Sequence, residues 1–272
     1  MKKILCPTDF SESAKNAIAY AAKLAQVTNC SLYLLHVQSV FDITPVELVL
    51  GKNLSLEAAS ESLERDSLEI SRAFKIRCYA EVEESSHKLS AVIKERSKTF
   101  DLIVMGSNGP DDLYQFFGGS NTYNAIVKAD VPVLLIPEGY EYSEIKSIIY
   151  AFDYFRERDL PLNHLLPFIK VLKCDLKVLQ VMEESYSSEA ESDLHDVQRI
   201  IKDFFAEDLT ITYDTIRAGD IPQSINSYTL GNQPDVLALC SGHRSFLGNL
   251  FHKSVTRHIT AICNYPVFIF HQ

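Results

Sequence analysis

The sequence predicts an α/β protein made of two tandem, doubly wound parallel sheets. Short apolar runs alternate with segments of helical periodicity along the whole chain. The apolar runs are nearly continuous, which is typical of parallel strands covered by helices on both faces. The order of these runs in the first half recurs in the second, which indicates an internal duplication. A length of 272 residues suits one large or two medium domains.

Strands and helices are predicted in alternation through the first half. Ser11 is a candidate N-cap for the helix that follows it, because its hydroxyl can accept from an early backbone N–H of that helix. The predicted strands are 2–9, 31–37, 75–83, 101–106 and 131–137. The predicted helices are 12–29, 55–73, 86–97 and 120–129.

The second half repeats the pattern, with predicted strands 146–153, 175–182, 209–216, 235–240 and 265–270. Helices are predicted over 157–173, 188–206 and 220–230. Similar local sequences support the repeat: ILCPTDF matches IIYAFDY, YLLHV matches VLQVM, DLIVMG matches DVLALC, and DVPVLLIP matches NYPVFIF. We therefore predict domains 1–139 and 145–272, joined by a linker over 138–144.

Composition and charge exclude several classes of protein. The net charge is -10, which disfavours binding to nucleic acid or to an anionic membrane surface. The apolar runs are too short for a membrane span, and the start MKKILCPTDF is too short in apolar residues for a signal peptide. The six cysteines are scattered without close pairs, so we expect no disulfides and a cytoplasmic protein.

The segment 105–121, MGSNGPDDLYQFFGGSN, holds four of the ten glycines and directly follows an apolar run. Gly106 and Gly109 can adopt positive φ and let backbone amides approach an anion. Gly119, Ser120 and Asn121 open a predicted helix whose first amides have no partner within the helix. This arrangement suits phosphates, whereas the plainer alternative is a connection whose glycines only make tight turns.

The spacing of Gly106, Gly109, Gly119 and Ser120, after a strand and before a helix, resembles the ATP-binding motif of the universal stress protein family. The opening ILCPTDFSESAKNAIAYAAKLA and the ending DVPVLLIP resemble that family's first βα unit and last strand. The duplication is similar to its tandem members. The resemblance implies a Rossmann-like fold of the adenine-nucleotide alpha-hydrolase type, with five parallel strands per domain in the order 3-2-1-4-5.

The resemblance also implies a binding site for ATP, ADP or AMP, with or without magnesium, in the first domain. It places Asp9 beside the adenosine and the backbone of Val37 at the adenine edge. It places the phosphates at Gly106, Gly109, Gly119 and Ser120, with Asn121 following. A plainer reading makes Asp9 a turn-former or a partner of the helix dipole.

Two departures from the family pattern bear on this site. Pro110-Asp111-Asp112 stands where a basic residue is common, and its two carboxylates would repel the phosphates. We therefore expect the affinity for the nucleotide to be weak or to depend on a bound cation. In the second half, Cys240, His243 and Lys253 take the three glycine positions, while Ser254 and Asp153 are retained. Bulky residues there should block close backbone approach, so we expect no equivalent nucleotide site in the second domain.

Three functions remain open at this point. The favoured one is a nucleotide-binding stress-response regulator without catalytic residues, in which the second domain acts as a built-in dimer partner through VPVLLI and YPVFIF; a homodimer is also possible. The alternatives are a slow ATPase or self-phosphorylating enzyme that uses the same site, and a scaffold that binds no nucleotide. Zinc at a cluster of Cys240, His243, His252 and His258 is disfavoured, because no second short ligand pair completes the set.

Overall fold

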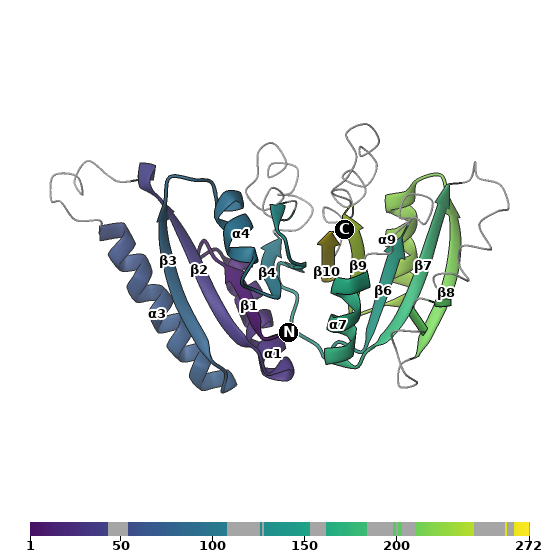
Figure 1. Cartoon of the computed structure of the whole chain (residues 1–272), viewed down its shortest axis with the longest axis horizontal. Coiled ribbons are helices and arrows are strands. Elements are labelled where there is room, and N and C mark those ends of the chain that lie inside the picture. The colour runs from purple at the N-terminus through teal and green to yellow at the C-terminus, as the bar shows by residue number, and fades with distance from the viewer. Residues whose placement is uncertain are drawn as a thin grey trace. The chain divides into compact units, whose positions relative to one another are not determined.

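The chain divides into two compact units, Met1–Tyr142 and Ser143–Gln272, and the predicted linker spans that boundary. The computed structural model describes residues 1–42, 54–107, 126, 128–152, 162–183, 198–199, 201–202, 210–241, 259 and 264–271 (Figure 1). The predicted helices 120–129 and 188–206 lie almost wholly outside these residues. Within the described residues, no helix is long and apolar enough to cross a membrane.

The first unit contains one parallel sheet of five strands in the order β3-β2-β1-β4-β5. This confirms the predicted order 3-2-1-4-5. The strands are β1 (Lys3–Pro7), β2 (Ser31–Ser39), β3 (Cys78–Ser85), β4 (Leu102–Ser107) and β5 (Val133–Pro137). Strand order reverses at β1, because β2 and β4 lie on either side of it.

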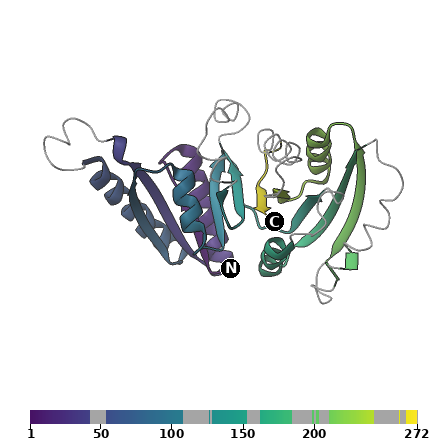
Figure 2. The ribbon, with the colours of Figure 1, turned by 45° about the horizontal axis from the view of Figure 1, so that its top comes forward.

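The helices of this unit are α1 (Glu12–Thr28), α3 (Leu54–Phe74) and α4 (Leu89–Ser97), with a short 3-10 turn, η1 (Val40–Asp42). Helices α1 and α3 pack on one face of the sheet. Helix α4 lies on the opposite face (Figure 2). Its Arg96 donates to Glu81 and Glu83 of β3 at 2.8 Å each. Ser11 caps α1 as predicted, and its Oγ accepts from Ala14 N.

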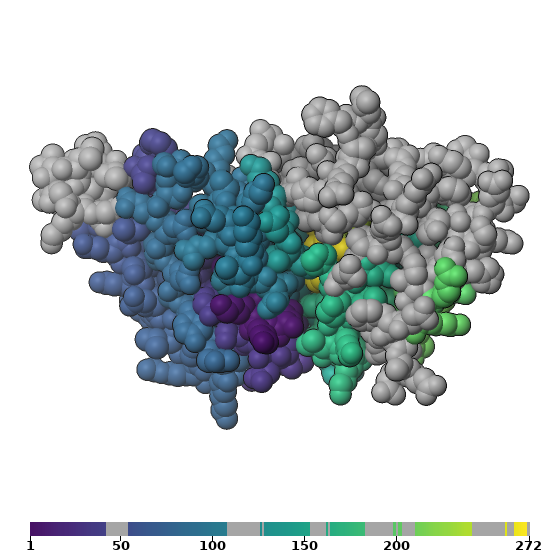
Figure 3. All heavy atoms as spheres, viewed as in Figure 1, coloured from purple at the N-terminus to yellow at the C-terminus, as the bar shows by residue number. Residues whose placement is uncertain are grey.

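Alanines make α1 fit closely against the sheet. Ala17, Ala21 and Ala25 are all fully buried, so the helix backbone lies near the strands without leaving a void. The chain is exposed at the start of β1, where Lys2 and Lys3 lie. The N-terminal segment, dark purple in Figure 3, reaches the molecular surface.

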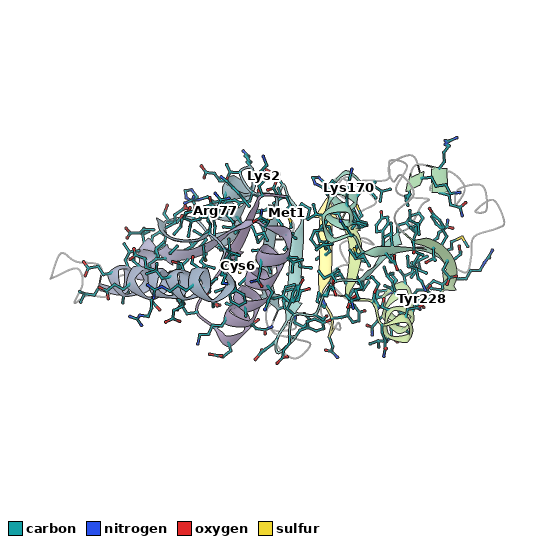
Figure 4. All side chains as sticks on the ribbon, turned by 90° about the horizontal axis from the view of Figure 1, so that it is seen from below. Met1, Lys2, Cys6, Arg77, Lys170 and Tyr228 are labelled. Carbon is teal, nitrogen blue, oxygen red and sulfur yellow. The ribbon has the colours of Figure 1, made fainter. Side chains whose placement is uncertain are left out.

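The second unit repeats the strand order as β8-β7-β6-β9-β10, again with parallel pairs. Its strands are β6 (Ser147–Phe152), β7 (Asp175–Glu183), β8 (Ile211–Ala218), β9 (Val236–Ser241) and β10 (Val267–His271). Its described helices are α7 (Leu162–Leu172) and α9 (Ile221–Asn232), with Tyr228 of α9 labelled in Figure 4. The predicted fold class is confirmed in both units.

Strand register aligns the two units residue by residue. Ile4 pairs with Leu32, and Ile148 pairs with Leu176, so β1 and β2 correspond to β6 and β7 at a separation of 144 residues. The predicted match of YLLHV with VLQVM is therefore wrong by one residue, since KVLQV is the true counterpart. The predicted alignment was displaced by one residue because apolar residues of similar size match equally well at either position. The counterpart of His36 is thus Gln180.

The left-handed residue that ends the first helix also recurs. Asn29 and Lys173 both have φ 54°, and each is followed by a buried cysteine, Cys30 or Cys174. Asparagine adopts this conformation readily, whereas lysine does so less often. The second unit thus keeps the backbone geometry with a less suitable residue.

An aspartate before the fourth strand of each unit fixes the start of the first strand. Asp101 Oδ2 accepts from the amides of Lys2 and Lys3 at 2.6 and 2.9 Å. Asp235 Oδ2 accepts likewise from the amides of Lys146 and Ser147 at 2.9 and 3.0 Å. Both aspartates thus satisfy strand-end amides that would otherwise bond only to water.

We expect Asp101→Ala to lower the free energy of unfolding of the first unit by about 1 kcal/mol, because two charge-assisted bonds are lost at an exposed site. Asp101→Asn, which keeps one acceptor oxygen, should lose less. Urea unfolding followed by circular dichroism measures both changes. Asp235→Ala is the matched variant in the second unit, and an unchanged midpoint for both alanine variants would contradict the capping role.

Candidate functional site

Three of the predicted site residues lie at the carboxyl ends of adjacent strands in the first unit. Asp9 lies two residues beyond the end of β1, Val37 lies in the last third of β2, and Gly106 is the next-to-last residue of β4. Because β1 is the strand at which the order reverses, its carboxyl end adjoins the crevice in which open α/β sheets bind ligands. The other predicted residues, Gly109, Gly119, Ser120 and Asn121, lie outside the described residues.

The loop from β1 to α1 is held by its own side chains. Thr8 Oγ1 accepts from Phe10 N at 3.0 Å, and Asp9 Oδ1 accepts from Ser11 N at 3.0 Å. Asp9 is therefore a turn-former, as the plainer reading of the sequence proposed. Its side chain is also exposed, so the carboxylate is accessible to a ligand as well.

The backbone at Phe10 is unusual. Its φ is 64°, in the left-handed region that bulky residues rarely occupy. Its ring packs against the ring of His36, with the centroids 4.7 Å apart. A nearby contact therefore helps to offset an unfavourable backbone conformation directly after Asp9.

His36 is a residue of this region that the sequence analysis did not single out. It lies beside the predicted Val37, and its Nδ1 is 2.9 Å from the carbonyl oxygen of Thr8. The available signal was a polar, ring-bearing residue near the end of an otherwise apolar strand. Only the register of β2 against β1 shows which loop it reaches.

Gly106 does not have the backbone conformation that the sequence analysis expected. It lies in β4 and lacks a positive φ, so the expectation of left-handed backbone at this residue is wrong. A Cβ on Gly106 would lie 2.5 Å from the carbonyl oxygen of Ser13 and 2.8 Å from its carbonyl carbon. Glycine is needed here because the first turn of α1 lies directly against β4. Ser13 Oγ is buried in this contact and has no hydrogen-bond partner among the described residues.

The second unit has a different set of residues at the same edge. Leu237 and Val236 of β9 pair as Ile103 and Leu102 of β4 do, which places Cys240 at the position of Gly106. Cys240 is buried, so the second unit carries a side chain at the position where the first unit has glycine. Asp153, His243, Lys253 and Ser254 lie outside the described residues.

The chemistry available in the described part of the site is recognition by a carboxylate and by backbone groups. Asp9 offers hydrogen-bond acceptors to hydroxyl or amino groups, and Val37 offers a main-chain N–H and C=O. Among the described residues, no group of three or more histidine, cysteine, aspartate or glutamate side chains could hold a metal ion.

These features define a doubly wound α/β protein in which three predicted site residues lie at the strand-order reversal of the first sheet. The sequence model of the universal stress protein family matches residues 1–137. Half of the chain is thereby matched, and the chain belongs to the universal stress protein family.

Individual relatives agree with this assignment. Universal stress protein MJ0577 of Methanocaldococcus jannaschii is 29% identical over 152 residues, which cover 50% of this chain and 94% of the relative. The universal stress protein in the QAH/OAS sulfhydrylase 3′ region of Thermus aquaticus is 31% identical over 149 residues, covering 50% of this chain and 98% of the relative.

Among solved structures, a universal stress protein from Archaeoglobus fulgidus matches nearly the whole chain. Its TM-score is 0.79 at 18% identity, and the match covers 99% of this chain and 98% of that one. At this identity the likeness supports the fold alone. Both units of this chain are therefore present, as a fold, in that protein.

Proposed function

We propose that the first unit binds an adenine nucleotide, ATP with Mg²⁺ or its ADP or AMP forms, and that the second unit binds none in this way. The observation that carries the proposal is the meeting of Asp9, Val37 and Gly106 at one sheet edge, at the strand-order reversal. The glycine spacing of the loop that follows Gly106 supports phosphate binding there. The loss of glycine at all three corresponding positions, Cys240, His243 and Lys253, supports confining the site to the first unit.

The proposed role is regulation of a stress response in the cytoplasm, with nucleotide occupancy as the signal. In the described residues near the site, Asp9 engages the loop's own backbone and has no histidine or lysine hydrogen-bonded to it. This supports binding over chemistry, because a catalytic base needs a partner that tunes it.

We also propose that the second unit serves as a built-in partner for the first through the last strand of each. The support is the apolar sequence of both strands, VLLIP and VFIFH, which would promote aggregation if left unpaired. A nucleotide-dependent change in this pairing would give the regulator its output.

ATP with Mg²⁺ is expected to raise the melting temperature of the full chain. At a ligand concentration of 100 times Kd, the stabilisation is about 2.7 kcal/mol, which corresponds to a shift of about 5–15 °C for a unit of this size. Differential scanning fluorimetry measures the shift, and isothermal titration calorimetry gives the affinity and a stoichiometry of about one.

Asp9→Ala should remove most of the shift, because it removes the carboxylate that would contact the nucleotide. Asp153→Ala is the matched control, since Asp153 stands 144 residues further on at the corresponding position of the second unit. If ATP and Mg²⁺ leave the melting temperature of the wild type unchanged, the proposal fails. If Asp153→Ala alone abolishes the shift, the nucleotide has been assigned to the wrong unit.

A further inference from the structure

We propose that His36 is a positioning residue that holds Asp9 in the orientation in which the nucleotide would meet it. This inference rests on the proposed function, because Asp9 has a role there only if a nucleotide binds. His36 itself would not contact the ligand. It acts on the residues directly before and after Asp9.

On the side before Asp9, β2 fixes both main-chain groups of Thr8. Thr8 N donates to Leu35 O at 2.8 Å, in continuation of the strand ladder. Thr8 O lies 2.9 Å from His36 Nδ1. A carbonyl oxygen only accepts, so Nδ1 carries the proton and donates it to Thr8. The peptide group that joins Thr8 to Asp9 is thereby fixed in direction.

On the side after Asp9, the ring of His36 contacts Phe10. The two ring centroids are 4.7 Å apart and the planes are inclined by 43°. Phe10 has a φ of 64°, which is unfavourable for an aromatic residue without compensating contacts. The ring of His36 and the hydroxyl of Thr8, which accepts from Phe10 N, supply those contacts.

These two restraints fix the backbone from which the carboxylate of Asp9 projects. Its Oδ1 accepts from Ser11 N, and Ser11 Oγ in turn caps α1. The side chain is therefore directed by the loop backbone on one side and by the helix start on the other. Loss of the His36 contacts would free the peptide group between Thr8 and Asp9 and the ring of Phe10, while leaving the side chain of Asp9 intact.

The second unit provides a natural comparison. Gln180 takes the place of His36, and Phe152 takes the place of Thr8. Gln180 is buried, its Oε1 accepts from Thr215 Oγ1 at 3.4 Å, and its Nε2 has no hydrogen-bond partner among the described residues. The bond from β2 to the loop of the first unit therefore lacks a described counterpart in the unit that we expect to bind no nucleotide.

Two substitutions separate the donor from the ring. His36→Asn keeps an N–H near the position of Nδ1 but loses the ring, whereas His36→Phe keeps a ring against Phe10 but has no donor. We expect His36→Phe to weaken ATP binding about tenfold, the equivalent of one hydrogen bond, and His36→Asn to weaken it about threefold or less. His87→Phe, at an exposed histidine of the same unit, is the matched control and should leave the affinity unchanged.

Two measurements without nucleotide test the positioning itself. The ¹⁵N shifts of the wild-type His36 ring should show the proton on Nδ1. Hydrogen exchange at the amides of Phe10 and Ser11 should be about tenfold faster in His36→Phe than in the wild type or His87→Phe, since the loop opens more often.

The outcomes distinguish this inference from the proposed function. Wild-type protein that binds no ATP refutes the function, and the exchange rates then decide whether His36 holds the loop. An Nδ1 that carries no proton in the wild type, or unchanged exchange at Phe10 and Ser11 in His36→Phe, refutes the positioning role whatever the affinity for ATP. Weaker ATP binding with faster exchange in His36→Phe, and near-normal values in His36→Asn, supports it.

Discussion

Gly106→Ala is expected to destabilise the first unit by about 1–3 kcal/mol, the range for added bulk in a well-packed contact. The new Cβ would lie 2.5 Å from the carbonyl oxygen of Ser13, and main-chain atoms of a helix cannot move aside as a flexible side chain can. Either α1 shifts away from β4 or the strand bends. The midpoint of urea unfolding, followed by a probe in the first unit, measures the loss.

Two further variants identify the cause. Gly231→Ala adds a methyl group on α9 where no atom lies within 4 Å, so it should stabilise the second unit by about 0.5–1 kcal/mol through helix propensity. Adding Ser13→Ala to Gly106→Ala should not restore stability, because the clash involves the main chain of Ser13. Full recovery in this double variant would show that the side-chain hydroxyl, and not the helix backbone, requires glycine at 106.

Cys78 is expected to react with iodoacetamide at pH 8 about 10³-fold more slowly than an unhindered thiol, although it is half-buried and not enclosed. Burial raises the pKa of its thiol from 9.0 to about 12, so the reactive thiolate is about 10³-fold scarcer. Cys174 in the second unit, whose pKa burial also raises to about 12, should behave alike. Alkylation followed by peptide mass spectrometry measures both rates.

The same shift predicts how stability depends on pH. The unfolded chain releases the Cys78 proton near pH 9 and the folded chain only near pH 12, so the folded state binds more protons between these values. Stability should therefore fall as pH rises from about 9 to 12. Cys6, labelled in Figure 4, lies on the sheet face that α1 covers. Burial raises the pKa of its thiol as well, which adds to the loss of stability at high pH. Alkylation of native Cys78 at the rate measured in urea would contradict this account.

Much of the fold could be predicted, because it depends on local patterns. The apolar runs located the strands, and Ser11 marked the start of α1 through its capping hydroxyl. Helix α4 begins at Leu89, three residues later than predicted, because Ser85 Oγ accepts from His87 N and forms a turn in place of a helical start. Such competition between side chain and backbone is weakly visible in sequence.

The candidate site could be predicted only in part. Asp9 could be proposed because the resemblance to the family implies an aspartate after the first strand. His36 was missed because its partner, Thr8, is 28 residues away and is reached only through strand register. For Gly106, positive φ was expected and is absent, and its need for glycine comes instead from a helix that begins more than 90 residues earlier. Contacts of this kind depend on tertiary packing, and local periodicity in the sequence does not predict which distant residues will meet.

The unequal connection between the second and third strands has a practical consequence. Leu32 pairs with Cys78, and Leu176 pairs with Ile211, so 46 residues separate the paired positions in the first unit and 35 in the second. Since connections of both lengths join corresponding strands, the connection from the second to the third strand tolerates a change of length at small entropic cost. It is therefore a place to graft a fluorescent reporter or an affinity handle without breaking the pairing of β2 with β3.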